Sequence, residues 1–259
     1  MQHTRWYSFR RTPQHTSRRS FAARCAQLVI TTLLTCATSN LASAQAVVAE
    51  RRPTVAVMEF ESAAMVKREE FAALTIGMQV MLANAIATNP RIEIVERQNI
   101  QKILAEQNLT TAGRVEEATA AKVGKLLGVR HMLLGAFVVL PNMDMRLTVR
   151  SVNTETGAWE WSDEVSGKGD QIFKLIDQLA TKVNAGLKLP GIRVKAASKD
   201  LGTDGPNQLE AAKALSAARR LEEQGDFKGA IAMYQKSVQL NGDVGPARVR
   251  LAMLEKSAR

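Results

Sequence analysis

The chain has 259 residues, of which 46% are apolar and 23% charged, the composition of an ordinary globular protein with one or two domains. Its net charge of +10 lies mostly in residues 1–44, which hold six arginines and no acidic residue, so the rest has 29 basic and 25 acidic residues, a net charge of +4. Both cysteines and two of the three histidines lie in the same segment. The remaining chain has no thiol and one imidazole, His131. This excludes disulfides, cysteine nucleophiles and Cys/His zinc sites there. We therefore expect no nucleic-acid partner and no metal or other cofactor.

Residues 1–44 have the organisation of a cleavable secretory signal. A basic region is followed by an uncharged apolar stretch at 25–34 and by the small residues Ala42-Ser43-Ala44. The apolar stretch has about ten residues, half of the ~20 that a membrane-spanning helix requires. The pattern predicts export to the periplasm and cleavage before Gln45.

Two short motifs leave the export chemistry open. The sequence at 17–21, Ser-Arg-Arg-Ser-Phe, is similar to a twin-arginine motif, and we do not choose between this route and the general secretory route. The segment ending at Cys36 resembles a lipoprotein box, but Thr35 stands where a small residue is required. We favour a soluble mature chain over lipidation of Cys36.

The first half of the remaining chain alternates strands and helices. The apolar run at 54–58 predicts a buried strand, and the three- and four-residue spacing of apolar side chains predicts a helix over 69–88, ended by Asn89-Pro90. A second strand is expected at 92–95, directly followed by a helix that starts at 96.

The second half begins with a predicted helix at 115–127, which ends at Gly128. The apolar run at 129–140 predicts a central strand buried on both faces. Two antiparallel strands, 145–152 and 158–165, and an amphipathic helix at 172–187 follow. The order β-α-β-α-α-β-β-β-α predicts an α/β (α+β) fold in which helices cover a mixed sheet, within a domain of residues 45–189.

The rest of the chain has a different composition. Residues 190–205 are rich in Gly, Lys, Asp and Ser, and we expect a linker there. Residues 206–259 resume a helical period and predict a small all-α tail. The apolar residues of so short a tail form one layer, so we expect this layer to dock on the α/β domain, on another protomer or on a partner peptide.

Four short motifs follow one another in the α/β region: Glu96-Arg97-Gln98 at the strand–helix junction, the later Glu106-Gln107, the helix end at Gly128 and the turn at Gly157. In this order they resemble the CsgG-like family, named for the curli production assembly/transport component. The resemblance extends over about 53–189. It implies a periplasmic module, often ring-forming, that helps to export or assemble an extracellular polymer. The family-motif residues themselves are expected to be structural.

The resemblance also has limits. The short turn at 141–144 leaves no room for the membrane-spanning hairpins of the founding protein, so we expect this chain to lie peripheral to the outer membrane rather than to span it. A regulator of peptidoglycan synthases with the same fold remains an alternative. Both hypotheses imply protein partners of the envelope or secretion machinery, a homo-oligomer and no enzymatic activity.

The tail carries a second resemblance. Gln224-Gly225-Asp226-Phe227, followed by Ala230, Tyr234 and Ser237, is similar to the second half of a tetratricopeptide repeat. In such a repeat, Phe227 and Tyr234 fill the seam between two helices.

Few residues suggest chemistry. Glu96 and Arg97 are interpreted as a helix start in which Arg97 pairs locally, and His131 as a structural histidine without a nearby partner in sequence. Trp159 and Trp161, two positions apart on a strand, are expected to share one face and are candidates for a partner surface. With Phe227 and Tyr234 they complete the candidate interaction residues. We expect no catalytic residues.

Overall fold

The computed structural model describes residues 52–107, 109, 116–188, 207–242 and 244–257. The expected signal at 1–44, with Cys36, and the expected linker at 190–205 lie outside the described residues. Residues Arg52–Arg259 form one unit, and the description below concerns this unit alone.

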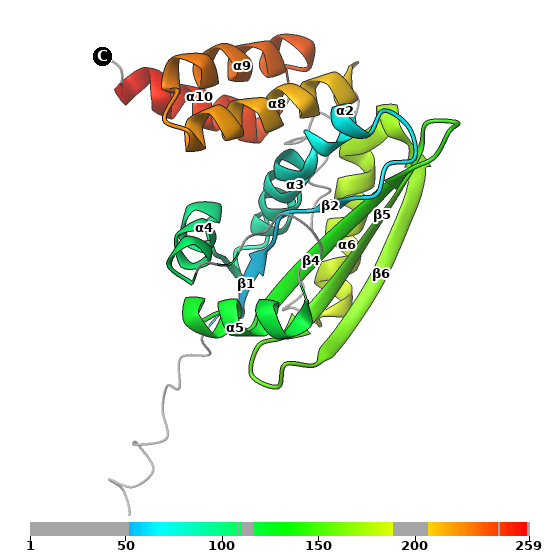
Figure 1. Ribbon diagram of the computed structural model, residues 1–259, viewed down its shortest axis with the longest axis vertical. Helices are drawn as coiled ribbons and strands as arrows, with labels where there is room; N and C mark the ends of the chain where they lie inside the picture. Colours follow the sequence, from blue (N-terminus) through cyan, green and yellow to red (C-terminus); the bar gives the residue numbers. More distant parts are fainter. Residues whose placement is uncertain (1–51, 108, 110–115, 189–206, 243, 258–259) are drawn as a thin grey trace, which may run out of the picture. The chain divides into compact units, whose positions relative to one another are not determined.

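A mixed sheet lies at the centre of the unit (Figure 1). Its strands are β1 (Thr54–Val57), β2 (Glu61–Ser62), β3 (Glu93–Ile94), β4 (His131–Val139), β5 (Asp144–Asn153) and β6 (Trp159–Lys168). The order is β3-β1-β4-β5-β6, and β2 pairs with the far half of β4. Strands β1 to β4 run parallel to one another, whereas β5 is antiparallel to β4 and β6 is antiparallel to β5. The predicted fold class and the central position of β4 are confirmed.

The helices follow the predicted order. They are α2 (Arg68–Ala72), α3 (Thr75–Ala87), α4 (Arg97–Glu106), α5 (Glu117–Leu127), the short η1 (Gly169–Gln171), α6 (Ile172–Gly186), α8 (Gln208–Glu223), α9 (Phe227–Leu240) and α10 (Gly245–Ser257). One predicted helix, 69–88, is broken in two. The carbonyl of Ala72 accepts from the Thr75 hydroxyl and that of Ala73 from Ser216, which takes both away from the helical ladder.

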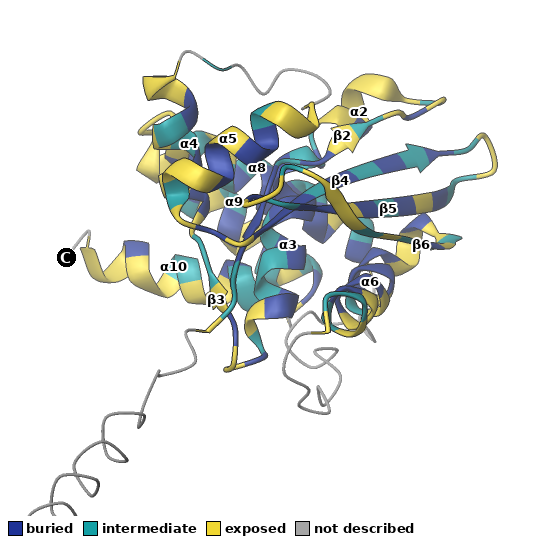
Figure 2. Cartoon of the chain, turned by 90° about the horizontal axis from the view of Figure 1, so that it is seen from below, coloured by how far each residue is buried: buried dark blue, intermediate teal, exposed yellow. Residues whose placement is uncertain are grey.

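The two faces of the sheet are covered by different helices. Val55 and Val57 point to the side of α3 and α6, while Ala56 and Met58 point to the side of α4 and α5. This alternation explains why the run at 54–58 is apolar throughout. Helices α4 and α5 cover the sheet near β1 and the start of β4, and β6 remains largely exposed (Figure 2).

Within the described residues, one helical segment, Arg68–Ala87, has the length and hydropathy of a membrane-spanning helix. It includes α3, in which eight residues are buried. Buried core helices of globular proteins can have the same length and hydropathy, and α3 is packed between the sheet, α6 and α8.

The tail docks on the α/β region, the first of the three expected alternatives. Helix α8 packs on α3 and α6, and apolar side chains of the tail belong to the same buried cluster as those of the two helices. The approach to α3 is close, because a Cβ at Gly77 would lie 3.1 Å from the carbonyl oxygen of Ala212 and 3.1 Å from the Cβ of Ser216.

Side chains of α8 also replace missing helix caps. Neither α3 nor α6 has a side-chain cap from its own N-cap residue. The buried Ser216 hydroxyl accepts from the backbone N–H of Gly77 at 2.9 Å, in the first turn of α3. The Gln208 side chain accepts from the N–H of Phe173 at 3.1 Å, in the first turn of α6. The tail therefore satisfies backbone groups of the α/β region as well as covering its apolar surface.

Candidate functional site

The family-motif residue Arg97 is the centre of a buried polar cluster. It occupies the first turn of α4, and its side chain is only 6% exposed. The guanidinium lies 3.1 Å from Glu59 Oε2, pairs with Glu223 at the end of α8 and donates to the side chain of Gln79 on α3. Gln79 is fixed in turn by its own bond to the carbonyl of Val57.

This cluster corrects the expectation that Arg97 pairs locally. Glu223 is 126 residues further along the chain, and its carboxylate contacts both Nε and Nη2 of Arg97, the second at 3.2 Å. A planar guanidinium that meets a carboxylate in this two-point geometry is held more specifically than a lysine would be. The junction motif therefore anchors the tail.

A second cluster lies one residue away on α8. Glu222 accepts from the Tyr234 hydroxyl at 2.7 Å, from Arg250 of α10 at 2.7 Å and from Arg219 at 3.3 Å. Burial alone would raise the pKa of Glu222, but the hydrogen bonds from Arg250 and Tyr234 and the charge of Arg219 outweigh it, and the pKa is lowered. Burial raises the pKa of Tyr234 well above its ordinary value, so this hydroxyl stays protonated and donates.

Between these two clusters lies a groove of about 390 Å³. Its walls come from α3, the end of β3, the start of α4, α8 and α10. Glu96, Arg97 and Gln98, the whole junction motif, line it. Glu96 and Gln98 are exposed there, while Arg97 is buried. We call this cavity the junction groove.

The other motif residues have local roles. Gly128 ends α5 with a φ of 67°, and Gly157 has a φ of 73° in the β5–β6 turn, so both occupy left-handed conformations that favour glycine. Glu106 and Gln107 are exposed at the end of α4, where Gln107 is the C-cap and Glu106 lies 4.0 Å from Lys102. None of these four residues lines the junction groove.

The two tryptophans do not share a face, contrary to the prediction. Val152 pairs with Trp159 but Ser151 with Trp161, so Glu160 is an extra residue in a β-bulge. Trp161 is half-buried against the main core, where a Cβ at Gly186 of α6 would collide with its indole. Trp159 lies on the opposite face and is 38% exposed.

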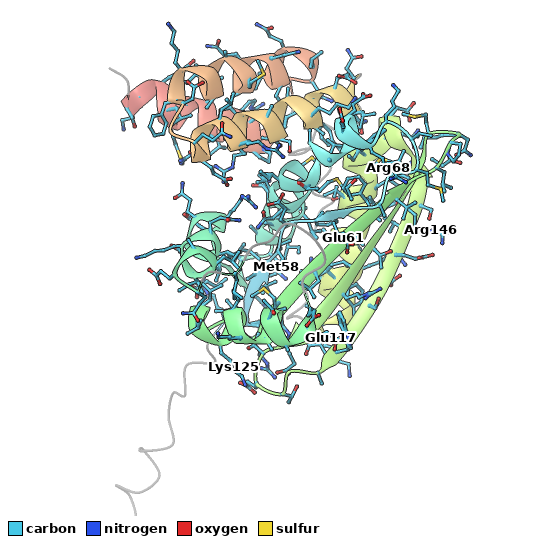
Figure 3. The ribbon with its side chains drawn as sticks, viewed as in Figure 1. Met58, Glu61, Arg68, Glu117, Lys125 and Arg146 are labelled. Atoms are coloured by element: carbon cyan, nitrogen blue, oxygen red, sulfur yellow. The ribbon has the colours of Figure 1, made fainter. Side chains whose placement is uncertain are left out.

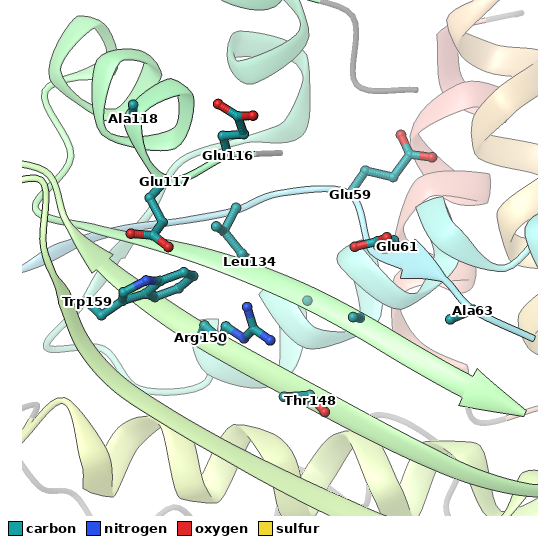
Figure 4. A pocket seen from close by; sticks show the side chains of 12 residues that line it. Glu59, Glu61, Ala63, Glu116, Glu117, Ala118, Leu134, Thr148, Arg150 and Trp159 are labelled. Atoms are coloured by element: carbon teal, nitrogen blue, oxygen red, sulfur yellow. The ribbon is translucent and has the colours of Figure 1, made fainter. Parts of the chain in front are cut away.

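Trp159 borders a cleft of about 650 Å³ on the open face of the sheet (Figure 4). The Arg150 guanidinium lies 5.3 Å from the centre of its indole ring. Four carboxylates also line the cleft, and in the close view that of Glu117 lies beside the indole. They are Glu59, Glu61, Glu116 and Glu117. Figure 3 shows Arg146 nearer the start of β5, away from Glu117.

His131 has a partner that the sequence does not reveal. Its Nδ1 contacts the carboxylate of the bulge residue Glu160, which also accepts from the Ser151 hydroxyl at 2.7 Å. Ser151 and His131 are both buried. The serine donates to the glutamate rather than to the imidazole, so the three residues lack the nucleophile–base contact of a hydrolase and fasten β4, β5 and β6 together.

The two aromatic candidates of the tail differ in exposure. Tyr234 is fully buried and fills the seam between α8 and α9, as expected, which corrects its assignment to a partner surface. Phe227, at the start of α9, is 54% exposed and therefore does not fill the seam. Of the four candidate interaction residues, only Trp159 and Phe227 are exposed.

Sequence reasoning missed Arg219 and Arg250, which carry charge into the junction groove, and Glu59 and Glu223, which hold Arg97. Their positions depend on packing between elements far apart in sequence, and no local pattern marks them. Among the described residues, no group of three or more His, Cys, Asp or Glu side chains is arranged to hold a metal ion.

Comparison with known proteins supports part of the resemblance. The family model described as "Curli production assembly/transport component CsgG" matches residues 37–142, which include β1 to β4 and the helices between them. The match ends before β5, so the part of the resemblance at 145–167 lies outside it, and the tetratricopeptide interpretation of the tail stays a prediction. No curated protein matches the chain in sequence.

Solved structures with a similar arrangement are distant. The LpoB C-terminal domain from Salmonella enterica is 15% identical, with 50% of this chain and 91% of that chain covered and a TM-score of 0.36. Lipoprotein GNA1162 from Neisseria meningitidis is 14% identical, with coverages of 52% and 94% and a TM-score of 0.38. The PelC dodecamer from Paraburkholderia phytofirmans is also 14% identical, with coverages of 53% and 90% and a TM-score of 0.34. At these TM-scores the likeness carries no argument about function. What the comparisons establish is a match to the CsgG family model over residues 37–142.

Proposed function

We propose that this chain is a non-enzymatic, exported accessory module that supports secretion or assembly of an extracellular polymer through contacts with other proteins. The observation that carries the proposal is the CsgG family match over residues 37–142, which includes the junction motif. The signal-like leader agrees with it, since such a module works in the periplasm, peripheral to the outer membrane.

The described side chains support a binding role more than a catalytic one. The one histidine outside the leader is held by Glu160, and Arg97 is held by Glu59 and Glu223. Both arrangements fix the positions of elements. The exposed aromatic residues, Trp159 at the cleft and Phe227 on the tail, are the surfaces that we propose for partners or for a second copy of the chain.

The test is deletion of the gene in its native host, with complementation by the full chain and by a Trp159→Ala, Phe227→Ala double variant. We expect deletion to abolish the surface polymer, the wild-type chain to restore it, and the double variant to restore it poorly at equal abundance. Both replaced side chains are exposed, so the double variant is expected to fold.

Cell fractionation and mass spectrometry of the mature amino terminus, expected at Gln45, test the export step. Secretion that is unchanged in the deletion strain, or a chain found only in the cytoplasm, refutes the proposal. Co-purification of a peptidoglycan synthase with unchanged polymer export supports the alternative activator role. Sedimentation of the purified chain tests the homo-oligomer, and a monomer at all concentrations refutes it.

A further inference from the structure

The junction groove combines apolar walls with an arginine, Arg219, whose hydrogen-bond donors are not all paired. Val80, Ala83 and Ala87 of α3 form one wall with Ile94 and Val95, and Pro246 and Val249 of α10 form the opposite one. Val249 is 57% exposed, although it lies beside other apolar side chains. The volume of about 390 Å³ is within the range of small-ligand sites.

The charges that line the groove are mostly positive. Three arginines, Arg97, Arg219 and Arg250, and one acidic residue, Glu96, line it, a net charge of +2. The carboxylates that pair with Arg97 and Arg250 are not among the lining residues. The surface offered to a ligand is therefore cationic, although the clusters behind it are balanced.

Arg219 is the arginine with unused hydrogen-bonding capacity. Its Nη1 donates to Glu222 at 3.3 Å, while its Nε is buried and has no acceptor among the described residues. The Nε itself is closed to a ligand, but the guanidinium lines the groove and its side chain is 18% exposed. An anion in the groove therefore gains a charge-assisted bond from the Nη side of Arg219.

The start of α4 adds to the same field. Its N-cap residue, Glu96, makes no side-chain capping bond, and the first turn holds Arg97 and Gln98, which line the groove. The positive end of the helix dipole favours an anion at this position.

We propose that the junction groove binds the free carboxyl terminus of a partner polypeptide that ends in an apolar residue. The terminal carboxylate pairs with Arg219, and the last side chain packs between α3 and Val249. The carboxamides of Asn84 and Gln98, which also line the groove, both donate and accept, as a peptide backbone requires. This inference rests on the proposed function only in its premise that the chain binds proteins.

The test measures binding of fluorescein-labelled hexapeptides to the full chain by fluorescence polarisation. One peptide ends in two leucines with a free carboxylate, a second is its carboxyl-terminal amide, and a third ends in two serines. We expect the free acid to bind about tenfold more tightly than the amide, because only the acid makes the charged bond to Arg219. The serine peptide is expected to bind more weakly than the leucine acid.

Variants locate the site. Arg219→Gln should weaken the leucine acid about tenfold and leave the amide unchanged, while the neighbouring exposed Arg220→Gln changes neither. Val249→Asp should abolish binding of the acid, whereas Met253→Asp, a similarly exposed residue of the same helix outside the groove, should not. Val249 is exposed, so its variant tests the site even where Arg219→Gln unfolds the chain.

Three results overturn the proposal. These are equal binding of acid and amide, equal effects of Arg219→Gln and Arg220→Gln, and binding of laurate with no binding of any peptide. The last would assign the groove to a small amphiphile. The assay uses the purified chain, so peptide binding without an export defect, or an export defect without peptide binding, separates this inference from the proposed function.

Discussion

Replacement of Ser216 by alanine tests whether the tail is an integral part of the α/β fold. The Ser216 hydroxyl is buried, accepts from the backbone N–H of Gly77 at 2.9 Å and donates to the carbonyl of Ala73. The N-cap residue of α3, Leu74, has no side chain that could replace this cap. The substitution removes one oxygen atom, so its effect reports the two hydrogen bonds and little else.

The magnitude follows from the groups that lose their partner. A buried donor left without an acceptor costs about 1–3 kcal/mol, and loss of a helix cap costs about 0.5–2 kcal/mol. Both describe the same N–H of Gly77, so the costs are not summed. We expect Ser216→Ala to lower the free energy of unfolding by about 2 kcal/mol.

The assay is urea unfolding of the full chain followed by circular dichroism, with Ser237→Ala as the matched control. Ser237 is also fully buried, but its hydroxyl only donates to the Ala211 carbonyl, at 2.8 Å within the tail. Its replacement leaves no donor unsatisfied and should cost about 1 kcal/mol or less. A cost for Ser216→Ala equal to or below that of Ser237→Ala would refute the assignment of Ser216 as the cap of α3.

Three further substitutions test other parts of the structure by the same unfolding assay. Arg97→Met should cost about 1–3 kcal/mol, because it leaves the acceptors of Gln79, Glu59 and Glu223 unpaired. The exposed neighbour Gln98→Met should cost less than ~0.5 kcal/mol. Glu222→Gln should lower the free energy of unfolding at pH 7. The lowered pKa of Glu222 stabilises the wild-type fold at pH values above the unfolded pKa, and this contribution is lost on acidification. The variant lacks it, so its stability should fall less than that of the wild type between about pH 5 and 3. An unchanged acid profile would contradict this role. Gly186→Ala should cost about 1–3 kcal/mol by displacing the Trp161 indole, and Trp161→Phe should recover part of that loss; absence of rescue would contradict the collision.

Local patterns predicted most of the secondary structure. The alternation at 145–152 and the apolar runs at 54–58 and 129–140 have the periods of half-buried and fully buried strands, and β5, β1 and β4 lie there. These periods report which faces of an element meet the core, and the core makes the largest contribution to stability. The two-residue strand β2 was missed because so short a segment has no period.

The errors concern interactions between distant segments. The helix expected at 69–88 is broken where Ser216, more than a hundred residues away, bonds the Ala73 carbonyl. Arg97 has the local surroundings of an ordinary helix start, and its acidic partner on α8 becomes visible only after folding. The bulge at Glu160 reversed the side of Trp159 relative to Trp161, since one extra residue exchanges the two faces of a strand.

These distant contacts bear on the junction groove. One wall belongs to the α/β region and the other to α10, and a groove between two independently moving parts would have to be ordered on binding. Here α8 is fixed to α3 through Ser216 and to α4 through the Arg97–Glu223 pair, and Arg250 joins α10 to α8 through Glu222. The walls are thus held before a ligand arrives, which lowers the entropic cost of association. Disruption of the Arg97–Glu223 pair should therefore weaken peptide binding in the groove, although the proposed carboxylate contact is to Arg219.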